Sequence, residues 1–186
     1  YIQSCERVQY LFPKAHAVAY VLMAYRIAYC KVHHPKHFYA SYFTVRATDF
    51  DYTHVSKGLA YVKQFIKNVY QQGFKASATD KSTATYLELA NEMMERGYIF
   101  EKIDLYKSHP TKFLITEKGL LPPIASLAGV GNTAALAIAA ARDVNNPFIS
   151  REDLRLRAGI GKSVIEHMAE VGILDQLPEN NQIDLF

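Results

Sequence analysis

Two short glycine turns, about thirty residues apart, constrain most strongly what this chain of 186 residues can fold into. In each turn one aliphatic residue stands between two glycines. The first turn is Gly129, Val130 and Gly131, and the second is Gly159, Ile160 and Gly161. Glycine allows the backbone angles of a tight turn and the close approach of a ligand, because it has no Cβ. We expect the aliphatic residue to plug into the core beneath each turn, with a helix on either side.

The paired turns resemble the helix-hairpin-helix motif, here in tandem. A helix that begins directly after such a turn directs free N–H groups and the positive end of its dipole outward, which favours a phosphate. Two hairpins can hold phosphates on both strands of a duplex without reading its sequence. The candidate DNA contacts are Gly129, Val130, Gly131 and Asn132 in the first turn, and Gly159, Ile160, Gly161, Lys162 and Ser163 in the second. A single copy of this pattern would more often be a tight turn without a ligand. The prediction of DNA binding therefore depends on the presence of two copies.

The second turn also resembles the end of a phosphate-binding loop, Gly161-Lys162-Ser163. Leu156 stands where the pattern G-x-x-x-x-G-K-[ST] needs its first glycine, so we do not expect nucleotide hydrolysis. Three arginines precede this turn and can line the DNA side or form a solvated face: Arg151, Arg155 and Arg157.

Composition indicates a globular, mildly basic protein. Hydrophobic residues make up 49% of the chain and charged residues 21%, which suits one large or two small units with real cores. The formal net charge of +3 permits a nucleic-acid partner without requiring one. Cys5 and Cys30 show no CxxC spacing and no neighbouring histidine cluster, so we expect no zinc site, no disulfide framework and a reducing cytoplasm.

The longest apolar stretch, residues 15–30, is interrupted by His16 and Arg26 and is shorter than a membrane span. We therefore predict no membrane partner, and interpret the stretch as a helix that is buried on most sides. The chain starts with Tyr1 rather than Met, which favours a fragment of a longer protein.

Apolar spacing predicts a mainly α fold with a small β-ribbon. Helices are expected over 15–32, 36–43 and 55–69, then from a cap at Ser82 or Thr83 to Gly97, and from a capping box at 150–153. Residues 98–105 and 112–116 alternate enough to form the ribbon. The predicted parts are a helical subdomain at 1–97, a β-ribbon connector at 98–121, the tandem hairpin domain at 122–177 and an extended C-terminal tail at 178–186.

The end of the chain resembles the pentapeptide by which bacterial polymerases dock on the β sliding clamp. Its residues are Gln182, Ile183, Asp184, Leu185 and Phe186. Leu185 and Phe186 can fill an apolar pocket on a partner, while Gln182 fixes the orientation by hydrogen bonds. Such a segment folds on binding and so binds modestly, with a Kd of about 1 μM. The alternative is that the terminal Leu-Phe pair folds back onto the protein's own core.

The amino-terminal part carries a further resemblance. Residues 10–20, with the sequence YLFPKAHAVAY, are similar to a segment in the fingers of bacterial C-family replicative polymerases. The similarity continues through residues 25–29, 31–35, 40–43, 91–93 and 96–98. The carboxyl end resembles the PolC type of low-GC Gram-positive bacteria and mycoplasmas. The resemblance covers essentially the whole chain. It implies a C-terminal part of a DNA polymerase III α subunit, with residues 1–97 derived from the fingers.

This resemblance implies DNA-template-directed DNA synthesis in chromosome replication, in which palm carboxylates hold Mg²⁺. Asp49-Phe50-Asp51 has D-x-D spacing but stands in a connection between helices, so we expect no catalytic residue, metal or other cofactor in this chain, and no activity of the chain alone. Lys14 and His16, near a helix start, are the candidates for contact with nucleotide phosphates. The alternative is that His16 is a buried core histidine and Lys14 a solvated neighbour.

The expected partners are duplex primer–template DNA, the β sliding clamp, and an incoming dNTP through the full polymerase. A free-standing helix-hairpin-helix adaptor in repair or recombination is the alternative, and a helical scaffold without a DNA role is a third. Two departures weaken the first hairpin: Ala128 stands where many first hairpins have proline, and residues 134–141 carry little charge.

Overall fold

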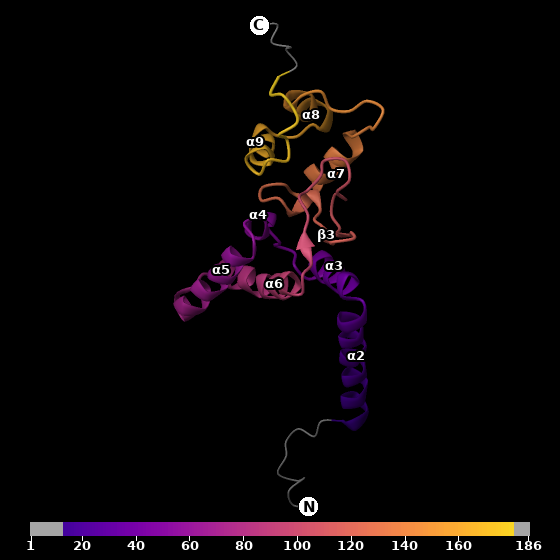
Figure 1. The fold of residues 1–186 in the computed structure, drawn as a ribbon, viewed down its shortest axis with the longest axis vertical. Helices are drawn as coiled ribbons and strands as arrows, with labels where there is room; N and C mark the ends of the chain where they lie inside the picture. The colour runs from indigo at the N-terminus through magenta and orange to yellow at the C-terminus, as the bar shows by residue number, and fades with distance from the viewer. Residues whose placement is uncertain (1–12, 181–186) are drawn as a thin grey trace, which may run out of the picture. The chain divides into compact units, whose positions relative to one another are not determined.

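The computed structural model describes residues 13–180, and these are mainly helical (Figure 1). The expected mainly α fold class is confirmed. The helices are α2 (Lys14–His33), α3 (Pro35–Val45), α4 (Tyr52–Ser56), α5 (Leu59–Gln72), α6 (Ala78–Glu95), α7 (Asn132–Ala141), α8 (Arg151–Ala158) and α9 (Lys162–Glu170). Two 3-10 turns, η1 (Gly73–Lys75) and η2 (Ile124–Ser126), and three short strands, β1 (Ile99–Phe100), β2 (Leu114–Ile115) and β3 (Gly119–Leu121), complete the described elements. The chain divides into two compact units between Phe38 and Tyr39, so the limits predicted at 97, 121 and 177 fall inside the second unit.

Helix α2 belongs to the first unit, and its side chains are not buried there. It spans the stretch predicted as helical, but none of its residues is buried and Tyr25 is 75% exposed. The prediction of a helix buried on most sides is wrong for this chain. Burial of every side needs neighbours on every side, and the described part of this unit holds, besides α2, only the start of α3. None of the described helices is both long and apolar enough to cross a membrane.

Aromatic rings form the centre of the core in the second unit. The ring of Phe43 in α3 lies 5.3 Å, centroid to centroid, from that of Phe50 and 5.6 Å from that of Phe113. Phe50 lies 5.0 Å from Tyr86 of α6. Ring pairs of this kind contribute about 0.5–1.5 kcal/mol each beyond the area that they bury. The cluster therefore packs α3, α6 and the segment before β2 against one another.

Two predicted helix boundaries are wrong. The helix expected over 55–69 is two helices, α4 and α5, because Gly58 between them has a φ of +86°, which interrupts a right-handed helix. Helix α6 begins at Ala78, earlier than the serine and threonine predicted as its caps. The hydroxyl of Ser77 accepts a hydrogen bond from the amide of Asp80 at 3.0 Å, and this cap starts the helix one turn sooner.

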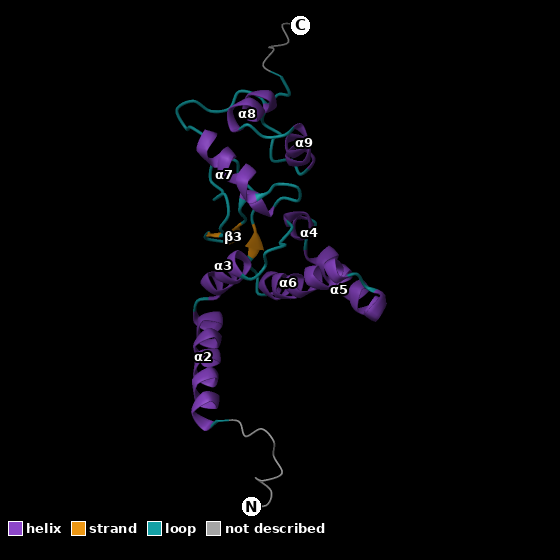
Figure 2. Ribbon diagram, turned by 180° about the vertical axis from the view of Figure 1, so that it is seen from behind, coloured by secondary structure: helices purple, strands orange, loops and turns teal. Residues whose placement is uncertain are grey.

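The predicted β-ribbon is instead a small three-stranded sheet (Figure 2). Strand β3 lies in the middle, parallel to β1 and antiparallel to β2. The prediction that the segments around β1 and β2 pair with each other is wrong, because both pair with β3. All of β3 is buried, so it lacks the alternation of polar and apolar residues by which a half-buried strand is predicted.

The close pairing of β1 and β3 depends on Gly119, which lies opposite Ile99. A Cβ on Gly119 would lie 2.0 Å from the carbonyl oxygen of Ile99. We expect Gly119→Ala to force the strands apart and to lower the free energy of unfolding by about 3 kcal/mol, the upper end of the usual cost of overpacking. Urea denaturation measures the change. Gly131→Ala is the control, because a Cβ there meets nothing within 4 Å. Equal stability of the two variants would contradict the strand pairing.

Candidate nucleic-acid interface

Each glycine turn starts with a left-handed residue. Gly129 and Gly159 have φ angles of +77° and +63°, which residues with a side chain rarely adopt. The residue after each of them is buried, since Val130 is 4% and Ile160 7% exposed. The prediction that the aliphatic residue plugs into the core is confirmed at both turns.

Each turn ends in a glycine that caps a helix. Gly131 precedes α7 and Gly161 precedes α9, and neither offers a side-chain hydrogen bond to its helix. Among the described residues, no protein acceptor pairs with the amides of Asn132 and Lys162, the first residues of the two helices. Open amides at the positive end of a helix dipole attract an anion.

Neither backbone conformation nor packing requires glycine at the two caps. Gly131 and Gly161 have ordinary φ angles of −71° and −69°. A Cβ on Gly131 would meet nothing within 4 Å, and one on Gly161 would meet only the hydroxyl of Ser163, at 3.7 Å. Glycine is an acceptable N-cap, although serine, asparagine and aspartate are better ones. The missing side chains leave the start of each helix open to a ligand, as a phosphate site needs.

The repeat extends beyond the turns themselves. Residues 129–140 and 159–170 have the same order of buried, half-buried and exposed positions. The buried residues correspond in pairs: Val130 and Ile160, Ala135 and Ile165, and Ile138 and Met168. In both copies the capping glycine and the two residues after it are exposed. The two hairpins therefore present equivalent helix starts, although they share few identical residues.

The hairpins differ in the element before the turn. Helix α8 leads into the second turn, whereas η2, a single 3-10 turn, leads into the first. The prediction of a helix on both sides of the first turn is wrong in this respect. Pro122 and Pro123 stand directly before η2, and prolines lack the amide hydrogen that a longer helix needs. The hydroxyl of Ser126 donates to the carbonyl of Pro123 at 2.6 Å and closes the short turn.

Arg157 holds the hairpins together rather than facing a ligand. Its guanidinium donates to the carbonyls of Ala141 at 2.9 Å and Asn146 at 3.0 Å, and pairs with Asp153 at 3.3 Å. It also lies over the ring of Phe148, 4.5 Å from the centroid. Its donors are therefore used between the end of α7 and the start of the second hairpin, and a role of Arg157 on the DNA side is not supported.

Arg151 and the root of the tail are structural as well. The amides of Arg151 and Glu152, at the start of α8, donate to the carbonyls of Pro178 at 2.8 Å and Glu179 at 3.2 Å. The side chain of Arg151 donates to the carbonyl of Leu177 at 3.2 Å. The prediction that the extended tail starts at residue 178 is therefore wrong for residues 178 and 179, whose carbonyls are bonded to the start of α8. The clamp-binding candidates, Gln182, Ile183, Asp184, Leu185 and Phe186, lie outside the described residues.

The remaining polar candidates lie at the open helix starts. Asn132, Lys162 and Ser163 are exposed, and Arg155 is half-buried. Lys162 forms an ion pair with Glu166, one turn later, at 3.6 Å. This pair contributes little, because both side chains are largely in water. The ammonium group of Lys162 can therefore exchange this partner for a phosphate.

Lys14 and His16 lie in the first turn of α2, within the first unit, and both are exposed. The alternative of His16 as a buried core histidine is wrong. Its ring lies 5.7 Å from that of Tyr20, one turn along the same helix. Contact of Lys14 and His16 with a nucleotide stays a prediction.

The D-x-D pair has a structural role at one of its members. Asp51 is the N-cap of α4, and its Oδ1 accepts hydrogen bonds from the amide of Thr53 at 2.8 Å and the hydroxyl of Thr53 at 2.7 Å. Across residues 13–180, no three His, Cys, Asp or Glu side chains are grouped so that they could hold a metal ion. These residues do not fit the magnesium site that the polymerase resemblance implies for a palm.

Known proteins match both the hairpins and the chain as a whole. A family model described as the helix-hairpin-helix motif matches residues 97–183. The PolC-type DNA polymerase III of Listeria innocua is 50% identical over 186 residues, that of Caldanaerobacter subterraneus 53% and that of Bacillus subtilis 48%. The whole chain is homologous to one segment of the PolC-type DNA polymerases. Each match covers 100% of the chain but only 13% of the relative's own length.

The PolC similarity reaches parts of the chain that the motif model does not. Helices α2 to α6 all precede residue 97, where the motif match begins. They are nevertheless included in the similarity to PolC, which runs over all 186 residues. A helix-hairpin-helix adaptor needs no such segment, so the similarity weighs against the free-standing alternative.

The contacts of Arg157 predict a stability effect. We expect Arg157→Gln to lower the free energy of unfolding by about 2 kcal/mol, because two carbonyls lose hydrogen bonds from a charged donor. Urea denaturation measures the loss. Arg155→Gln in the same helix is the matched control, expected to change stability by no more than about 0.5 kcal/mol. A stable Arg157→Gln variant with weakened DNA binding would instead place Arg157 at a ligand.

Proposed function

We propose that this chain is the part of a PolC-type replicative DNA polymerase that grips duplex DNA. One observation carries the proposal: two copies of one turn present helix starts that are exposed, uncapped by side chains and equivalent in burial. A pair of such starts suits two phosphates of a duplex. The similarity to PolC supports replication as the setting, and the helix-hairpin-helix match supports DNA as the partner.

The grip would not depend on DNA sequence. Most of the proposed donors are backbone amides at the starts of α7 and α9, and such groups contact phosphates rather than base edges. Lys162 adds a single cation at the second hairpin. Affinity should therefore fall with added salt, but with a shallow slope, because few counterions are released when few cations bind.

We also propose the wider roles that the PolC resemblance implies. Nucleotidyl transfer with Mg²⁺ would take place on palm carboxylates that the described part of this chain does not supply. Lys14 and His16 would contact the phosphates of an incoming dNTP from the first turn of α2, where the helix dipole favours an anion. The whole assembly would work in the bacterial cytoplasm, on the chromosome.

Docking on the β sliding clamp is the last part of the proposal. It rests on the terminal pentapeptide, Gln182 to Phe186, and on its place just after a fixed point. The carbonyls of Pro178 and Glu179 are bonded to the start of α8. A peptide that begins a few residues beyond this anchor stays close to the second hairpin, so DNA binding would raise its effective concentration at a clamp on the same duplex.

A glycine substitution tests the DNA grip. We expect Gly161→Ala to reduce affinity for duplex DNA about tenfold, because the new methyl group covers an open helix start, while stability falls by no more than about 1 kcal/mol for a poorer N-cap. Fluorescence anisotropy with two duplexes of unrelated sequence measures both affinity and sequence preference, and circular dichroism verifies the fold. Strong discrimination between the duplexes, or undiminished binding by Gly161→Ala, would refute the proposal.

A second variant tests clamp docking. Burial of Leu185 and Phe186 should contribute about 1.5–3 kcal/mol each before ordering costs. Replacement of both by alanine should therefore weaken binding to a Gram-positive β clamp by about a hundredfold, with DNA binding and thermal stability unchanged. Calorimetric titration measures the affinity. Asn180→Ala, just before the peptide, is the control. Unaltered clamp binding by the double variant, or a loss of its thermal stability, would show that the pair serves another purpose.

A further inference from the structure

The first hairpin has no cation of its own. Lys162 is the first residue of α9 in the second hairpin, whereas Asn132 has the corresponding place in α7. Helix α7 has the sequence NTAALAIAAA, without a charged side chain. A phosphate at the first hairpin would therefore have amides but no counter-charge from that helix, and the two halves of the grip would be unequal.

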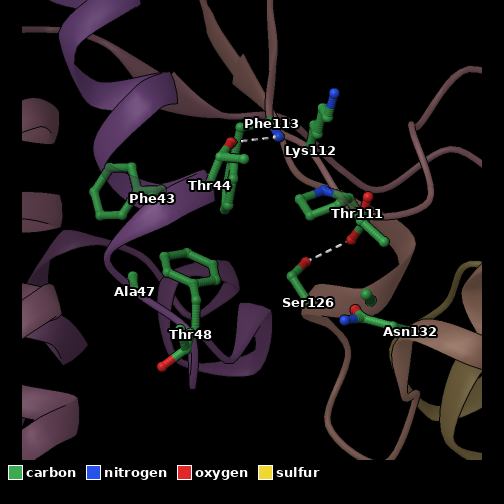
Figure 3. Close-up of a pocket in the computed structure, with 12 residues that line it drawn as sticks. Phe43, Thr44, Ala47, Thr48, Thr111, Lys112, Phe113, Ser126 and Asn132 are labelled. Carbon is green, nitrogen blue, oxygen red and sulfur yellow. Dashed lines mark hydrogen bonds between the residues drawn. The ribbon is translucent and has the colours of Figure 1, made fainter.

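A cavity beside the start of α7 brings a cation to this place (Figure 3). Its volume is about 350 Å³, and it lies wholly within the second unit. The end of α3 and the segment after it, the segment before β2, and residues between Pro123 and Asn132 form its walls. The polar residues that line it are Thr44, Thr48, Thr111, Lys112, Ser126 and Asn132. Lys112 lies at its rim, and in Figure 3 its exposed side chain points away from the other labelled residues; its flexible stem would have to turn to reach a ligand in the cavity.

The backbone that carries Lys112 is fixed in place. Nδ1 of His109 accepts hydrogen bonds from the amides of Thr111 and Lys112, both at 3.0 Å. The amide of Phe113 donates to the hydroxyl of Thr44 at 3.1 Å, which ties this segment to α3 (Figure 3). Partial burial lowers the pKa of His109, and the positive charges of Lys112 and Arg142 lower it further. The ring therefore stays neutral near pH 7 and keeps Nδ1 as an acceptor.

The cavity has the groups that a phosphodiester needs. Hydroxyls of Thr48 and Thr111 and the amide side chain of Asn132 can donate hydrogen bonds, and the open backbone amide of Asn132 adds the helix dipole. Lys112 can supply the positive charge. Buried rings of Phe43, Phe50 and Phe113 close one side, and shielding from water strengthens a charged contact.

We propose that this cavity binds a backbone phosphate of the DNA strand that the first hairpin contacts, with Lys112 as its cation. The site rests on the proposed DNA grip and extends it. Lys112 would supply the positive charge at the first hairpin, as Lys162 would at the second. Lys112 comes from the segment before β2, not from the hairpin itself. A free nucleotide or inorganic phosphate shares the same chemistry, so the test must separate these ligands from DNA.

The first arm of the test removes the charge. Lys112→Gln in the 186-residue chain should raise the Kd for duplex DNA about fivefold to tenfold at moderate salt, and should reduce the slope of log affinity against log salt by about one. Lys118→Gln is the matched control, because Lys118 is an exposed lysine nearby in sequence that does not line the cavity. The control should change the Kd by less than about twofold. Equal losses in both variants would overturn the site, since they would reflect net charge alone.

The second arm removes hydrogen bonds without a change of charge. The double variant Thr48→Val with Thr111→Val should weaken DNA binding at least about threefold. This is less than the usual free-energy contribution of one hydrogen bond. The salt slope should not change, because no charge is removed. Thermal melting of each variant verifies the fold. A variant that melts like the unaltered chain but binds DNA equally well would count against the site.

The third arm separates the ligands and the two proposals. Titration with dATP and with inorganic pyrophosphate, followed by the amide resonances of Thr111 and Asn132, should show much weaker binding than duplex DNA. Tighter binding of dATP that is lost in Lys112→Gln, with DNA affinity intact, would overturn the DNA assignment. If Gly161→Ala weakens DNA binding but Lys112→Gln does not, the phosphate site is wrong and the grip stands. If the unaltered chain does not bind duplex DNA, both proposals fail.

Discussion

The left-handed glycine at the start of each hairpin turn is the constraint on which the rest of the interface depends. Gly129 and Gly159 have left-handed φ angles, which end the preceding element and start the turn. Val130 and Ile160 consequently enter the core, and the next helix begins at the surface with its first two residues exposed. A residue with a Cβ in this conformation costs roughly 1–2 kcal/mol, and relief of that strain would tilt the helix that follows. The direction of both open helix starts is thus set by a backbone angle, not by any side chain that contacts a ligand.

Features set by neighbouring residues could be predicted from the sequence, and features set by distant residues could not. The turns, the aliphatic plugs and the cap at Ser150, whose hydroxyl accepts from the amide of Asp153 at 2.9 Å, are local and were predicted. Strand β3 was missed because its pairing with β1 depends on the approach of Gly119 to a segment twenty residues away. The burial of α2 was predicted from its apolar composition. Composition shows that a helix could be buried, but not which other elements pack against it.

The arginines show why charge alone is a poor guide to an interface. Arg151 and Arg157 precede the second turn and looked equally suited to DNA, yet both donate mainly to carbonyl groups of the protein. A guanidinium with several fixed donors is well suited to join segments that end in free carbonyls. Lys112 gave no signal in the sequence, because only the fold brings it to the cavity beside Asn132. The proposed site therefore uses mainly backbone amides and few cations.

Three helices begin in the hairpin region, and the contrast between them supports the choice of two as phosphate sites. The first three amides of α8 all have acceptors within the protein: the carbonyls of Pro178 and Glu179 and the hydroxyl of Ser150. Helices α7 and α9 begin instead after glycines that offer no side-chain acceptor. The chain therefore satisfies the first three amides of α8, whereas the first amides of α7 and α9, those of Asn132 and Lys162, have no acceptor in the described part of the protein. Since open amides are costly only where water or a ligand cannot reach them, the exposed pair is stable without a ligand and ready for one.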